Sequence, residues 1–311
     1  MSLGVNNLDK NKLYQQFLAF MIKENVLLDE PMKKHTSFKI GGPADILLMP
    51  QKVEEIQQAI ALCKAEGAEY FVMGNGSNLL VRDKGMRKVV IKIAEKFNDV
   101  TISEKGVVAQ AGILLSTLSK RVLQKSLKGF EFASGIPGTL GGAITMNAGA
   151  YGGEMKDVVE RCKVLDQEGE VLDLSFEELE LGYRSSIIQK KNYIVLEVTM
   201  KFEEGKYEDI KAITDDLTQK RTTKQPLHLP SAGSTFKRPP GYFAGKLIQD
   251  AGLKGARVGD AQVSDLHSGF IVNIGQATAA DVLNLMALIQ KKVFEQFAVE
   301  LQPEVRIVGE E

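Results

Sequence analysis

The chain has 311 residues, of which 44% are hydrophobic and 25% are charged, and its formal net charge is −1. This composition is that of a folded globular protein and excludes a disordered chain. Because no block of like charges exceeds a few residues, we expect no broad electrostatic surface for nucleic acid or an anionic membrane. Single hydrophobic cores stop growing near about 250–300 residues, so we expect more than one domain.

Cysteine and histidine usage predicts a reducing compartment and no metal. Cys63 and Cys162 lie in apolar periodic segments and have no CxxC partner, so we expect reduced core residues. His35, His228 and His267 lack metal-ligand spacing. The start of the chain has no apolar segment behind a basic one, and no run of about 18 apolar residues occurs. These features predict a cytoplasmic protein that is not embedded in a membrane.

The first third of the chain is expected to contain a helical appendage and a mixed α/β unit. Apolar residues recur at helical spacing over residues 12–28 and again over 53–66, where Gly67 ends the helix. Other segments in this third predict strands at 46–49, 70–73, 80–82 and 89–93, and a hairpin over 100–111.

The middle third predicts a helix from residue 115 to a stop at Gly129, then a hairpin at 161–165 and 171–174. Residues 193–202 alternate strongly, as expected of a long strand. After Lys206 the spacing predicts a helix whose inward face carries Ile210, Ile213 and Leu217.

In the last third, a helix is expected around residues 247–248 and strands at 270–273 and 304–308. Thr278 and Asp281 have the spacing of a capping box and predict the start of another helix. The core face of that helix is expected to carry Val282, Leu285, Met286, Ile289 and Val293.

The stretch GFEFASGIPGTLGGAITMNAGAYGGE, residues 129–154, contains eight of the 29 glycines. Glycine costs conformational entropy on folding, so a folded chain concentrates it where φ is positive or where a ligand lies against bare amides. Successive N–H groups in such turns bind anions, a pyrophosphate among them. A surface loop or a flexible linker is the alternative. Against that alternative stand four apolar residues spaced as if packed in a core: Ile136, Leu140, Ile144 and Met146.

A second glycine motif, Gly74 to Leu79, follows one expected strand and precedes another. The GxGxxG fingerprint of a Rossmann site must instead open a helix, so that kind of site is disfavoured. Two glycine loops about 60 residues apart could hold one extended pyrophosphate from two sides. This arrangement suits a flavin dinucleotide.

Six motifs occur in a fixed order: HTSFKIGGPA (35–44), GNGSNLL (74–80), GIPGTLGG with NAGAYG (135–142 and 147–152), GYRS (182–185), AGSTFK (232–237) and PEVR (303–306). Together they resemble the UDP-N-acetylenolpyruvoylglucosamine reductase (MurB) family. The resemblance extends from about residue 31 to residue 308.

The resemblance implies an α+β protein with the two-lobed FAD-binding fold of the vanillyl-alcohol-oxidase type and a C-terminal α+β substrate domain. We expect an N-terminal helical appendage over 1–30, FAD-binding lobes over 31–98 and 99–204, and a substrate-binding domain over 205–311. The last boundary also follows from the sequence, because residues 203–206 separate a long strand from a new helix.

The resemblance also implies a reaction. In the family, NADPH reduces bound FAD, and the enolpyruvyl group of UDP-N-acetylglucosamine enolpyruvate is then reduced to give UDP-N-acetylmuramate for peptidoglycan precursors. FAD is expected to be non-covalent, because residues 74–80 contain no histidine. NADPH is the expected co-substrate and a UDP-sugar the expected small-molecule substrate. No nucleic-acid or membrane partner is expected, and the protein is expected to be a monomer or a weak homo-oligomer.

By the same resemblance, FAD is expected to contact residues of both glycine motifs and one glycine between them. These are Gly74, Asn75, Gly76, Ser77, Asn78, Leu79, Gly112, Ser134, Gly135, Ile136, Pro137, Gly138, Gly141, Gly142, Ala143, Asn147 and Gly149. The expected substrate contacts are Lys224, Lys237 and Arg306.

Three residues match the catalytic needs of the implied reaction. Hydride addition to an enol-ether carboxylate pushes negative charge onto the carboxylate, which must meet a cation or hydrogen-bond donors. Arg184 can meet it with a planar guanidinium, and Glu304 can hold a proton beside it. Ser234 resembles the family's proton donor to the neighbouring carbon. A serine hydroxyl is a weak acid, but the intermediate is strongly basic.

Each residue also has an ordinary interpretation. Arg184 would more often be a structural or surface arginine, Glu304 and Arg306 could form a surface pair on one strand face, and Ser234 could be a helix cap or turn residue. Lys224 could be a helix C-terminal lysine favoured by the dipole. The ordered set of six motifs favours the catalytic interpretation.

Some members of the family insert a loop after the long strand, and a tyrosine of that loop closes over the substrate. Here Phe202 reaches the next expected helix through residues 203–206 alone, which indicates a shorter subtype. Two alternatives remain at this stage. One is a flavin oxidase or dehydrogenase of another sugar or alcohol on the same fold, and the other is a binding module without turnover.

Overall fold

A computed structural model describes residues 9–103 and 106–311. By packing, the chain divides into two compact units, and each is interrupted in sequence. Of the described residues, the first comprises 9–30, 45–75, 88–103 and 106–218, and the second comprises 31–44, 76–87 and 219–311. Residues 31–44 and 76–87, which the sequence grouped with the first FAD-binding lobe, therefore pack with the C-terminal part of the chain. The expected functional boundaries at residues 98 and 204 stay predictions.

The N-terminal part of the first unit is a four-stranded sheet in the order β1 (Val26–Pro31), β2 (Pro43–Leu48), β5 (Met86–Lys92) and β3 (Tyr70–Met73). α2 (Val53–Glu66) buries Ile56, Ala59, Ile60 and Cys63, and it ends at Gly67, whose φ of 66° is left-handed. The helix expected over 12–28 is wrong beyond its start. α1 spans only Lys10–Phe17, and Val26–Pro31 joins the sheet, where pairing outweighs the helical spacing.

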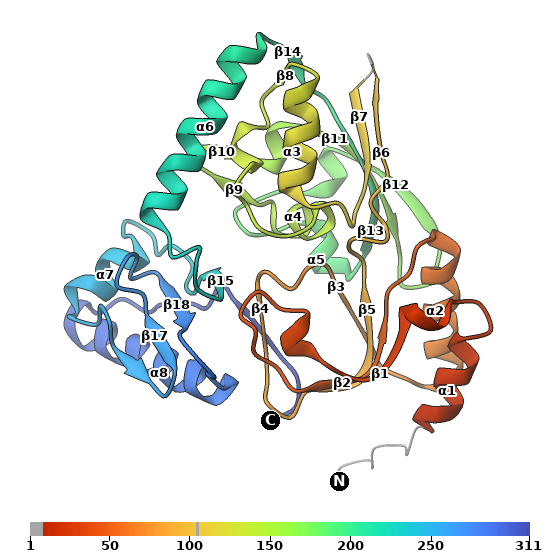
Figure 1. Cartoon of the computed structure of the whole chain (residues 1–311), viewed down its shortest axis with the longest axis horizontal. Coiled ribbons are helices and arrows are strands. Elements are labelled where there is room, and N and C mark those ends of the chain that lie inside the picture. Colours follow the sequence, from red (N-terminus) through yellow and green to blue (C-terminus); the bar gives the residue numbers. More distant parts are fainter. Residues whose placement is uncertain (1–8, 104–105) are drawn as a thin grey trace. The chain divides into compact units, whose positions relative to one another are not determined.

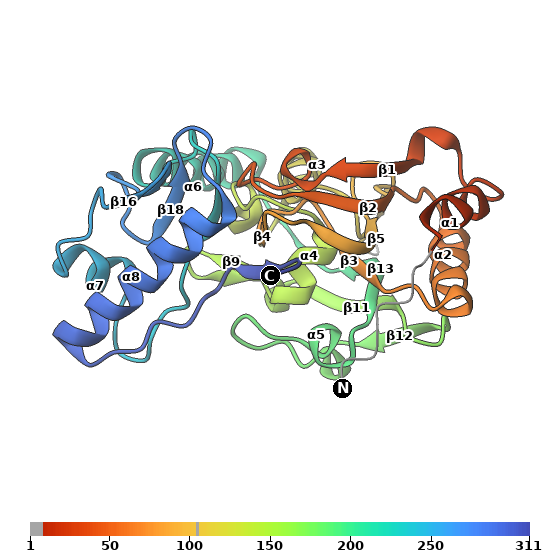
Figure 2. The same cartoon turned by 90° about the horizontal axis from the view of Figure 1, so that it is seen from below.

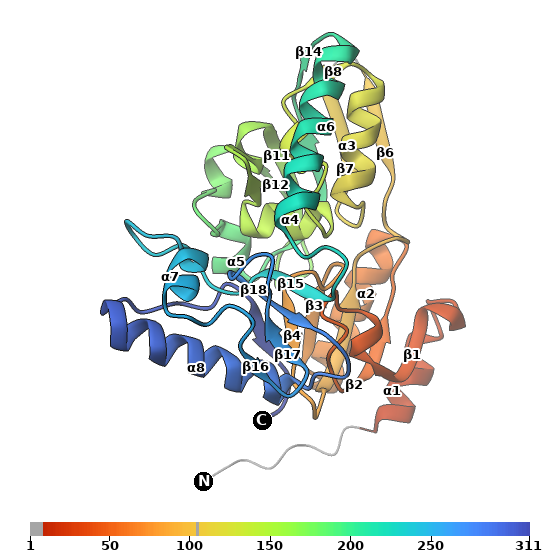
Figure 3. The same cartoon turned by 60° about the vertical axis from the view of Figure 1, so that its left-hand side comes forward.

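A five-stranded antiparallel sheet forms the rest of the core of this unit. Its order is β12 (Val171–Ser175), β11 (Val159–Leu165), β13 (Ile194–Met200), β7 (Gly106–Gln110) and β6 (Val100–Ser103). α4 (Leu140–Met146) packs against β13 and β7 (Figure 1). β8 (Leu127–Lys128) pairs with β14 (Glu203–Glu204) beside α3 (Leu115–Gln124) (Figure 3). The smaller elements are β9 (Gly149–Ala150), β10 (Gly153–Glu154) and α5 (Ile187–Lys191).

α6 (Tyr207–Lys224) corrects one expectation about burial. The helix forms where the sequence predicted it, but the side chain of Ile213 is 50% exposed and Leu217 is only half-buried. Ile210 is its one buried residue, since polar and charged residues surround the other apolar positions. The apolar spacing found the helix but not the face that it buries.

The second unit contains a four-stranded antiparallel sheet in the order β15 (Ser231–Ser234), β18 (Phe270–Asn273), β17 (Ala261–Val263) and β16 (Arg257–Val258). α8 (Ala279–Phe297) lies against this sheet (Figure 2). The capping box of Thr278 and Asp281 is confirmed, and the five predicted core residues of α8 are buried. α7 (Ala244–Asp250) packs on α8, and β4 (Leu79–Val81) pairs in parallel with β19 (Arg306–Val308). Short 3₁₀ turns occupy Lys23–Asn25, Met32–Lys34, Glu131–Ala133, Met155–Asp157 and Glu177–Leu179.

Both cysteines are buried free thiols, as predicted. Burial raises the pKa of Cys63 to about 12, and burial followed by the charges of Asp173 and Glu197 raises the pKa of Cys162. Both thiols are therefore protonated and unreactive at neutral pH. Within residues 9–103 and 106–311, no helix is both long enough and apolar enough to cross a membrane. The same residues contain no group of three or more His, Cys, Asp or Glu side chains arranged to hold a metal ion.

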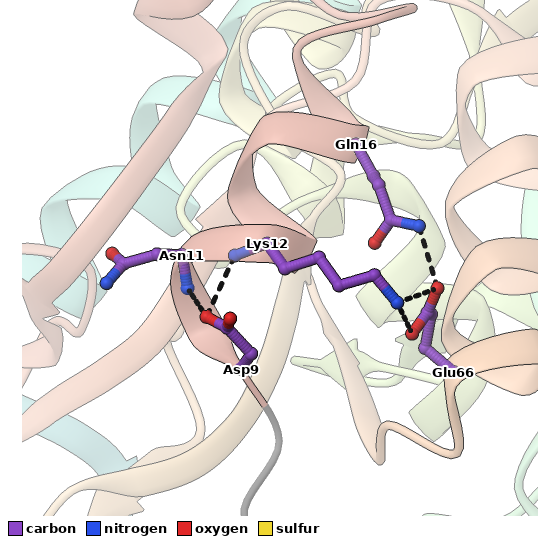
Figure 4. A network of polar contacts seen from close by, with 5 residues as sticks. All are labelled: Asp9, Asn11, Lys12, Gln16 and Glu66. Atoms are coloured by element: carbon purple, nitrogen blue, oxygen red, sulfur yellow. Dashed lines mark hydrogen bonds and ion pairs between the residues drawn. The ribbon is translucent and has the colours of Figure 1, made fainter.

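α1 is attached to the end of α2 by one carboxylate (Figure 4). Glu66 accepts hydrogen bonds from Gln16 Nε2 at 2.7 Å and from Lys12 Nζ at 2.8 Å, while Asp9 caps the first turn of α1. The hydrogen bond from Gln16, followed by that from Lys12, lowers the pKa of Glu66 below its ordinary value of 4.5. The ionised form of Glu66 therefore contributes to the attachment of α1, beside the buried side chains of Leu13 and Phe17.

We expect this attachment to weaken in acid. A carboxyl with a lowered folded-state pKa contributes its stabilisation above its ordinary pKa and loses it as pH falls through the lowered value. Hydrogen exchange at the amides of α1 should therefore speed up below pH 4.5 relative to the rest of the first unit. Glu66→Gln should remove most of that pH dependence. Glu168→Gln, which breaks the exposed pair with Lys64, is the matched control and should leave it in place. An unchanged exchange profile in Glu66→Gln would show that the apolar contacts of α1 hold it alone.

Candidate active site

The two glycine motifs meet inside the first unit. β3 ends at Met73 and leads directly to Gly74, and Thr139 is the N-cap of α4 in the long glycine stretch. A Cβ atom added to Gly74 would lie 2.2 Å from Thr139 Oγ1, a distance that no side chain tolerates. A side chain at residue 74 would therefore force Thr139 to shift, and the two loops approach each other at this point.

The long glycine stretch contains a helix that the sequence did not reveal. Thr139 accepts from Gly142 N at 3.5 Å, and Leu140–Met146 forms α4. Two glycines in its first turn lower helix propensity by about 1 kcal/mol each, which hid the helix from the apolar spacing. The first two N–H groups of α4 are not available to a ligand. Leu140 N donates to Ile113 O and Gly141 N donates to Ala111 O, each at 2.8 Å.

The predicted cofactor glycines fall into two groups when their surroundings are compared. An added Cβ would lie 2.1 Å from Ala94 O at Gly112, 2.9 Å from Ala111 Cβ at Gly141 and 2.7 Å from Gly153 O at Gly149. Packing within the protein explains these three glycines. Gly142 is exposed, and an added Cβ would meet Thr139 Oγ1 at an ordinary 3.6 Å. No clash within the protein therefore requires glycine at residue 142.

The other predicted cofactor residues of this stretch form the turn before α4. Ser134 and Ile136 donate their N–H groups to Glu131 O and Ala133 O. Gly135 and Pro137 lie in the same turn, and Gly138 has a φ of 113°, which only glycine adopts easily. The side chain of Ala143 is buried against the sheet.

Arg184 lies in a tight turn with a strained backbone. Gly182 and Ser185 exchange both backbone hydrogen bonds, at 3.0 and 3.2 Å. Arg184 occupies the third position of the turn with a φ of 54°, a left-handed conformation that favours glycine or asparagine. Its guanidinium carbon lies 5.2 Å from the centre of the Tyr183 ring, and Tyr183 is 58% exposed. Backbone strain of this kind persists only where surrounding contacts enforce it, and it is concentrated at functional sites.

The contacts that enforce this turn come from the C-terminal end of α4. Gln189 Nε2 donates to Arg184 O at 3.2 Å and to Thr145 O at 2.6 Å. Ser186 Oγ donates to the same Thr145 carbonyl at 2.8 Å. The helix that begins at the glycine motif thus also anchors the Arg184 turn.

Asn147, a predicted cofactor contact, has its side chain fully occupied within the protein. The residue is 1% exposed and ends α4 with a φ of 41°. Its Nδ2 donates to Glu154 Oε2 at 2.7 Å and to Gly182 O at 3.1 Å, and its Oδ1 accepts from Lys156 N at 3.0 Å. Asn147 therefore connects the glycine stretch to the Arg184 turn.

In the second unit, four of the six motifs are in contact. Ser37, from the first motif, donates its N–H to Gly76 O at 3.2 Å and its hydroxyl to Ser231 O at 2.6 Å. Gly76 has a φ of 62°, and Ser77 follows it toward β4, where Leu79 is buried. The N-terminal motif thus joins the first glycine loop to the strand that carries Ser234. Asn75 and Gly74 belong to the first unit.

Thr235, which follows Ser234 in sequence, connects Ser234 to the segment of Glu304. Ser234 pairs with Phe270 and follows an irregularity in β15, where Gly233 has a φ of 75°. The expected tight Gly-Ser turn is therefore a bulge in an edge strand. Thr235 O accepts from Glu304 N at 2.8 Å, and Thr235 Oγ1 accepts from Ile271 N at 3.1 Å. The sheet thereby brings two of the three predicted catalytic residues onto neighbouring backbone.

Asn78 bonds to the backbone on both sides of Val305. The side-chain Nδ2 of Asn78 donates to Glu304 O at 3.1 Å, and its backbone carbonyl accepts from Arg306 N at 3.0 Å. Leu79 then pairs with Arg306 as β4 runs beside β19. The first glycine loop and the PEVR motif are thus one hydrogen-bonded structure.

The predicted substrate residues lie in the second unit, as does one histidine that the sequence did not single out. Lys224 is the exposed last residue of α6, Arg306 is exposed in β19, and Lys237 N donates to Gln302 O at 2.8 Å. Burial lowers the pKa of His267, whose Nδ1 accepts from Gly269 N. Its ring packs edge-on against Phe270, the strand partner of Ser234.

Sequence reasoning missed Thr139, Thr235 and Gln189 as supports of the site. Thr139 carried a usable signal, since threonine before an apolar run is a common N-cap. Thr235 and Gln189 carried none, because their hydrogen bonds are with backbone atoms, which every residue possesses. In residues 201–206, between β13 and α6, the structure has only the short strand β14, so the connection is as short as predicted.

Comparison with known proteins identifies the family. A sequence profile of the UDP-N-acetylenolpyruvoylglucosamine reductase C-terminal domain matches residues 225–308, and a profile of an FAD binding domain matches residues 44–175. The UDP-N-acetylenolpyruvoylglucosamine reductase of Alkaliphilus metalliredigens (strain QYMF) is 70% identical over 303 residues, which cover 97% of this chain and 100% of that protein. The chain belongs to the UDP-N-acetylenolpyruvoylglucosamine reductase family.

Other members of the reductase family are similar over the same length. The protein of that name from Clostridioides difficile (strain 630) is 52% identical, with 99% of this chain and 100% of that protein covered. The crystal structure of the reductase from Thermus caldophilus has a TM-score of 0.78 at 39% identity and covers 91% of this chain and 97% of that one. An alkyldihydroxyacetonephosphate synthase, 18% identical with a TM-score of 0.50, shares the fold over 62% of this chain and 40% of that one. The predicted fold class is thereby confirmed.

Substituting alanine for each of the two kinds of glycine should have opposite effects on thermal stability. Gly142→Ala should leave the thermal stability of the apoprotein unchanged or higher, because alanine favours helix and meets no close atom. FAD affinity, measured by titrating apoprotein and following flavin fluorescence, should fall at least about 10-fold if the methyl group meets the cofactor. Gly141→Ala is the matched control and should lower the melting temperature, because its methyl group meets Ala111. Unchanged FAD affinity in Gly142→Ala would remove residue 142 from the cofactor site.

Proposed function

We propose that this chain uses NADPH to reduce the enolpyruvyl group of UDP-N-acetylglucosamine enolpyruvate to UDP-N-acetylmuramate, a step in the synthesis of peptidoglycan precursors. The observation that carries the proposal is the similarity to the reductases of this name over 97% of the chain. Overall, NADPH, a proton and the enolpyruvyl sugar nucleotide give NADP⁺ and the lactyl ether. The chain is an oxidoreductase of a family that contains an FAD binding domain.

The glycine motifs fit an FAD pyrophosphate. Close contact of Gly74 with Thr139 brings two loops together, and Gly142 is left bare on the exposed side of α4. When bound, FAD accepts two electrons from NADPH and supplies a hydride to the substrate double bond. We assign its phosphates to amides of the turns at 74–78 and 134–139 other than those of Ser134 and Ile136, which donate to backbone carbonyls. We propose non-covalent attachment because these turns contain no histidine.

We assign the following roles to the catalytic side chains. The Arg184 guanidinium meets the substrate carboxylate, on which negative charge develops as hydride arrives. Glu304 is the second side chain that we assign to that charge. The Ser234 hydroxyl donates its proton to the carbon beside the carboxylate and regains one from solvent. Thr235, the residue after Ser234, supports this assignment, because its carbonyl accepts from Glu304 N and its hydroxyl accepts from Ile271 N in β18.

Lys224, Lys237 and Arg306 supply positive charge for the diphosphate and carboxylate of the substrate. Residues 31–98 and 99–204 serve as FAD-binding lobes, and residues 205–311 bind substrate. The protein acts in the cytoplasm as a monomer or a weak homo-oligomer, and its two buried free thiols are consistent with a reducing compartment.

Anaerobic visible spectroscopy separates this function from its alternative. NADPH should bleach the oxidised flavin bands of the purified protein, and UDP-N-acetylglucosamine enolpyruvate should restore them. In Ser234→Ala, bleaching should keep its rate, whereas restoration should slow by about 10²–10⁴-fold because the proton donor is lost. Bleaching without restoration in the unmodified protein would instead support an oxidase or dehydrogenase of another substrate. Restoration at the normal rate in Ser234→Ala would show that another group gives the proton.

The role of Arg184 can be tested by a substitution that keeps its positive charge. Arg184→Lys loses the planar pair of donors, so the restoration rate should fall by about 10²–10³-fold, the cost of one such donor. Stopped-flow absorbance at several sugar-nucleotide concentrations measures the rate and the apparent affinity. Arg161→Lys, in an exposed pair with Asp173, is the matched control and should behave as the unmodified protein. If the two variants behave alike, Arg184 has no role in the reaction.

A further inference from the structure

The asparagine of each glycine motif donates to a backbone carbonyl in a catalytic segment. In the second unit, Asn78 Nδ2 lies 3.1 Å from Glu304 O. In the first unit, Asn147 Nδ2 lies 3.1 Å from Gly182 O, two residues before Arg184. We propose that both asparagines are positioning residues, which hold Glu304 and Arg184 in place and do not use their side-chain amides to bind the cofactor.

The occupancy of the Asn147 side chain and the two bonds from Asn78 to the Glu304 segment support this inference. The donor group of Asn147 is shared between Glu154 and Gly182, its oxygen accepts from Lys156 N, and the residue is 1% exposed. These contacts leave the side chain without a free face for a ligand. Asn78 is half-buried, and its side chain and its carbonyl bond to the residues on either side of Val305. A shift of the Asn78 loop would therefore move the backbone that carries Glu304.

The backbones that these asparagines hold need such support. Arg184 has a left-handed φ of 54°, which costs about 1 kcal/mol or more for a residue with a side chain. Gly182 O is the acceptor that closes its turn, and Asn147 bonds to the same oxygen. Glu304 precedes the short strand β19, which pairs with β4 only from Arg306 onward. Gly182 belongs to an isolated bridge and Glu304 lies outside β19, so in each case the asparagine adds a hydrogen bond to a segment outside a regular strand.

Positioning and cofactor binding predict different kinetic defects. If the asparagines bound FAD directly, their loss would weaken FAD and slow both half-reactions. If they hold Glu304 and Arg184, then FAD affinity and bleaching by NADPH should stay within about 3-fold, and only restoration by the sugar nucleotide should slow. A displacement of about 1 Å at a catalytic group can cost about 100-fold in rate. We therefore expect restoration to slow by about 10–100-fold.

The test uses Asn78→Ala and Asn147→Gly in the full chain. Glycine is chosen at residue 147 because it keeps the left-handed backbone while removing the amide. Stopped-flow absorbance follows both half-reactions, and FAD titration of the apoproteins gives the affinity. Hydrogen exchange of the apoproteins should show faster exchange in residues 303–308 for Asn78→Ala and in residues 182–186 for Asn147→Gly. This local change does not depend on the reaction.

Asn273→Ala is the matched structural control. Asn273 is also a buried asparagine that bonds to backbone, donating to Phe38 O and accepting from Gly275 N and Ala277 N. Its loss should lower the melting temperature while the folded protein keeps the ratio of the two half-reaction rates. A similar ratio change in Asn273→Ala would overturn the inference, because the defect would then follow from lost stability.

The inference about the asparagines depends on the proposed roles of Arg184 and Glu304. The experiments must therefore separate a failure of the inference from a failure of those roles. If the unmodified protein does not restore its flavin bands with the sugar nucleotide, the proposed function fails. If it does, and Arg184→Lys is also defective, but the asparagine variants keep the normal ratio of rates, the inference alone is overturned. Weaker FAD binding with slowing of both half-reactions would likewise overturn it and assign the asparagines to the cofactor.

Discussion

The approach of Gly74 to Thr139 is the constraint on which the first unit depends. The end of β3 and the N-cap of α4 lie so close that a single methyl group at residue 74 would be 2.2 Å from the threonine hydroxyl. This contact sets the position of α4, whose first turn is also tied by hydrogen bonds to Ala111 O and Ile113 O. The C-terminal end of the same helix anchors the turn that carries Arg184. One short helix therefore links the glycine motifs to a catalytic candidate.

In the second unit, strands in place of a helix support the candidate catalytic residues. Thr235 lies between the strand of Phe270 and the segment of Glu304, and it bonds to both through its backbone and its hydroxyl. Ser234 is thereby presented at an edge strand after a bulge, and Glu304 lies on the neighbouring backbone. Ser37 and Asn78 connect the first glycine loop to these strands. The side chains proposed for chemistry are thus held by backbone hydrogen bonds in a sheet, which is a stiffer support than a solvated loop.

Local signals predicted most elements correctly. Helices with an apolar face and a start or stop residue, such as α2 with Gly67 and α8 with Thr278 and Asp281, were found near their true bounds. Failures came where a local preference was weak or was overridden. Val26–Pro31 joined a sheet despite its helical spacing, and the glycines in the first turn of α4 concealed a helix. Ile213 of α6 is exposed, because spacing shows that a face exists but not whether anything packs on it.

The sequence by itself determined the family, the reaction and the identities of the candidate residues, because six motifs in order carry chemistry that depends on residue type. Only the tertiary structure separated glycines that packing requires, such as Gly112 and Gly141, from Gly142, where it requires none. It also showed that Asn78 and Asn147 are bonded to the segments of Glu304 and Arg184. The physical reason is that these contacts join residues up to 226 positions apart, through backbone carbonyls that every residue possesses. An acceptor common to all residues leaves no mark on the sequence, so only the folded backbone reveals which one is used.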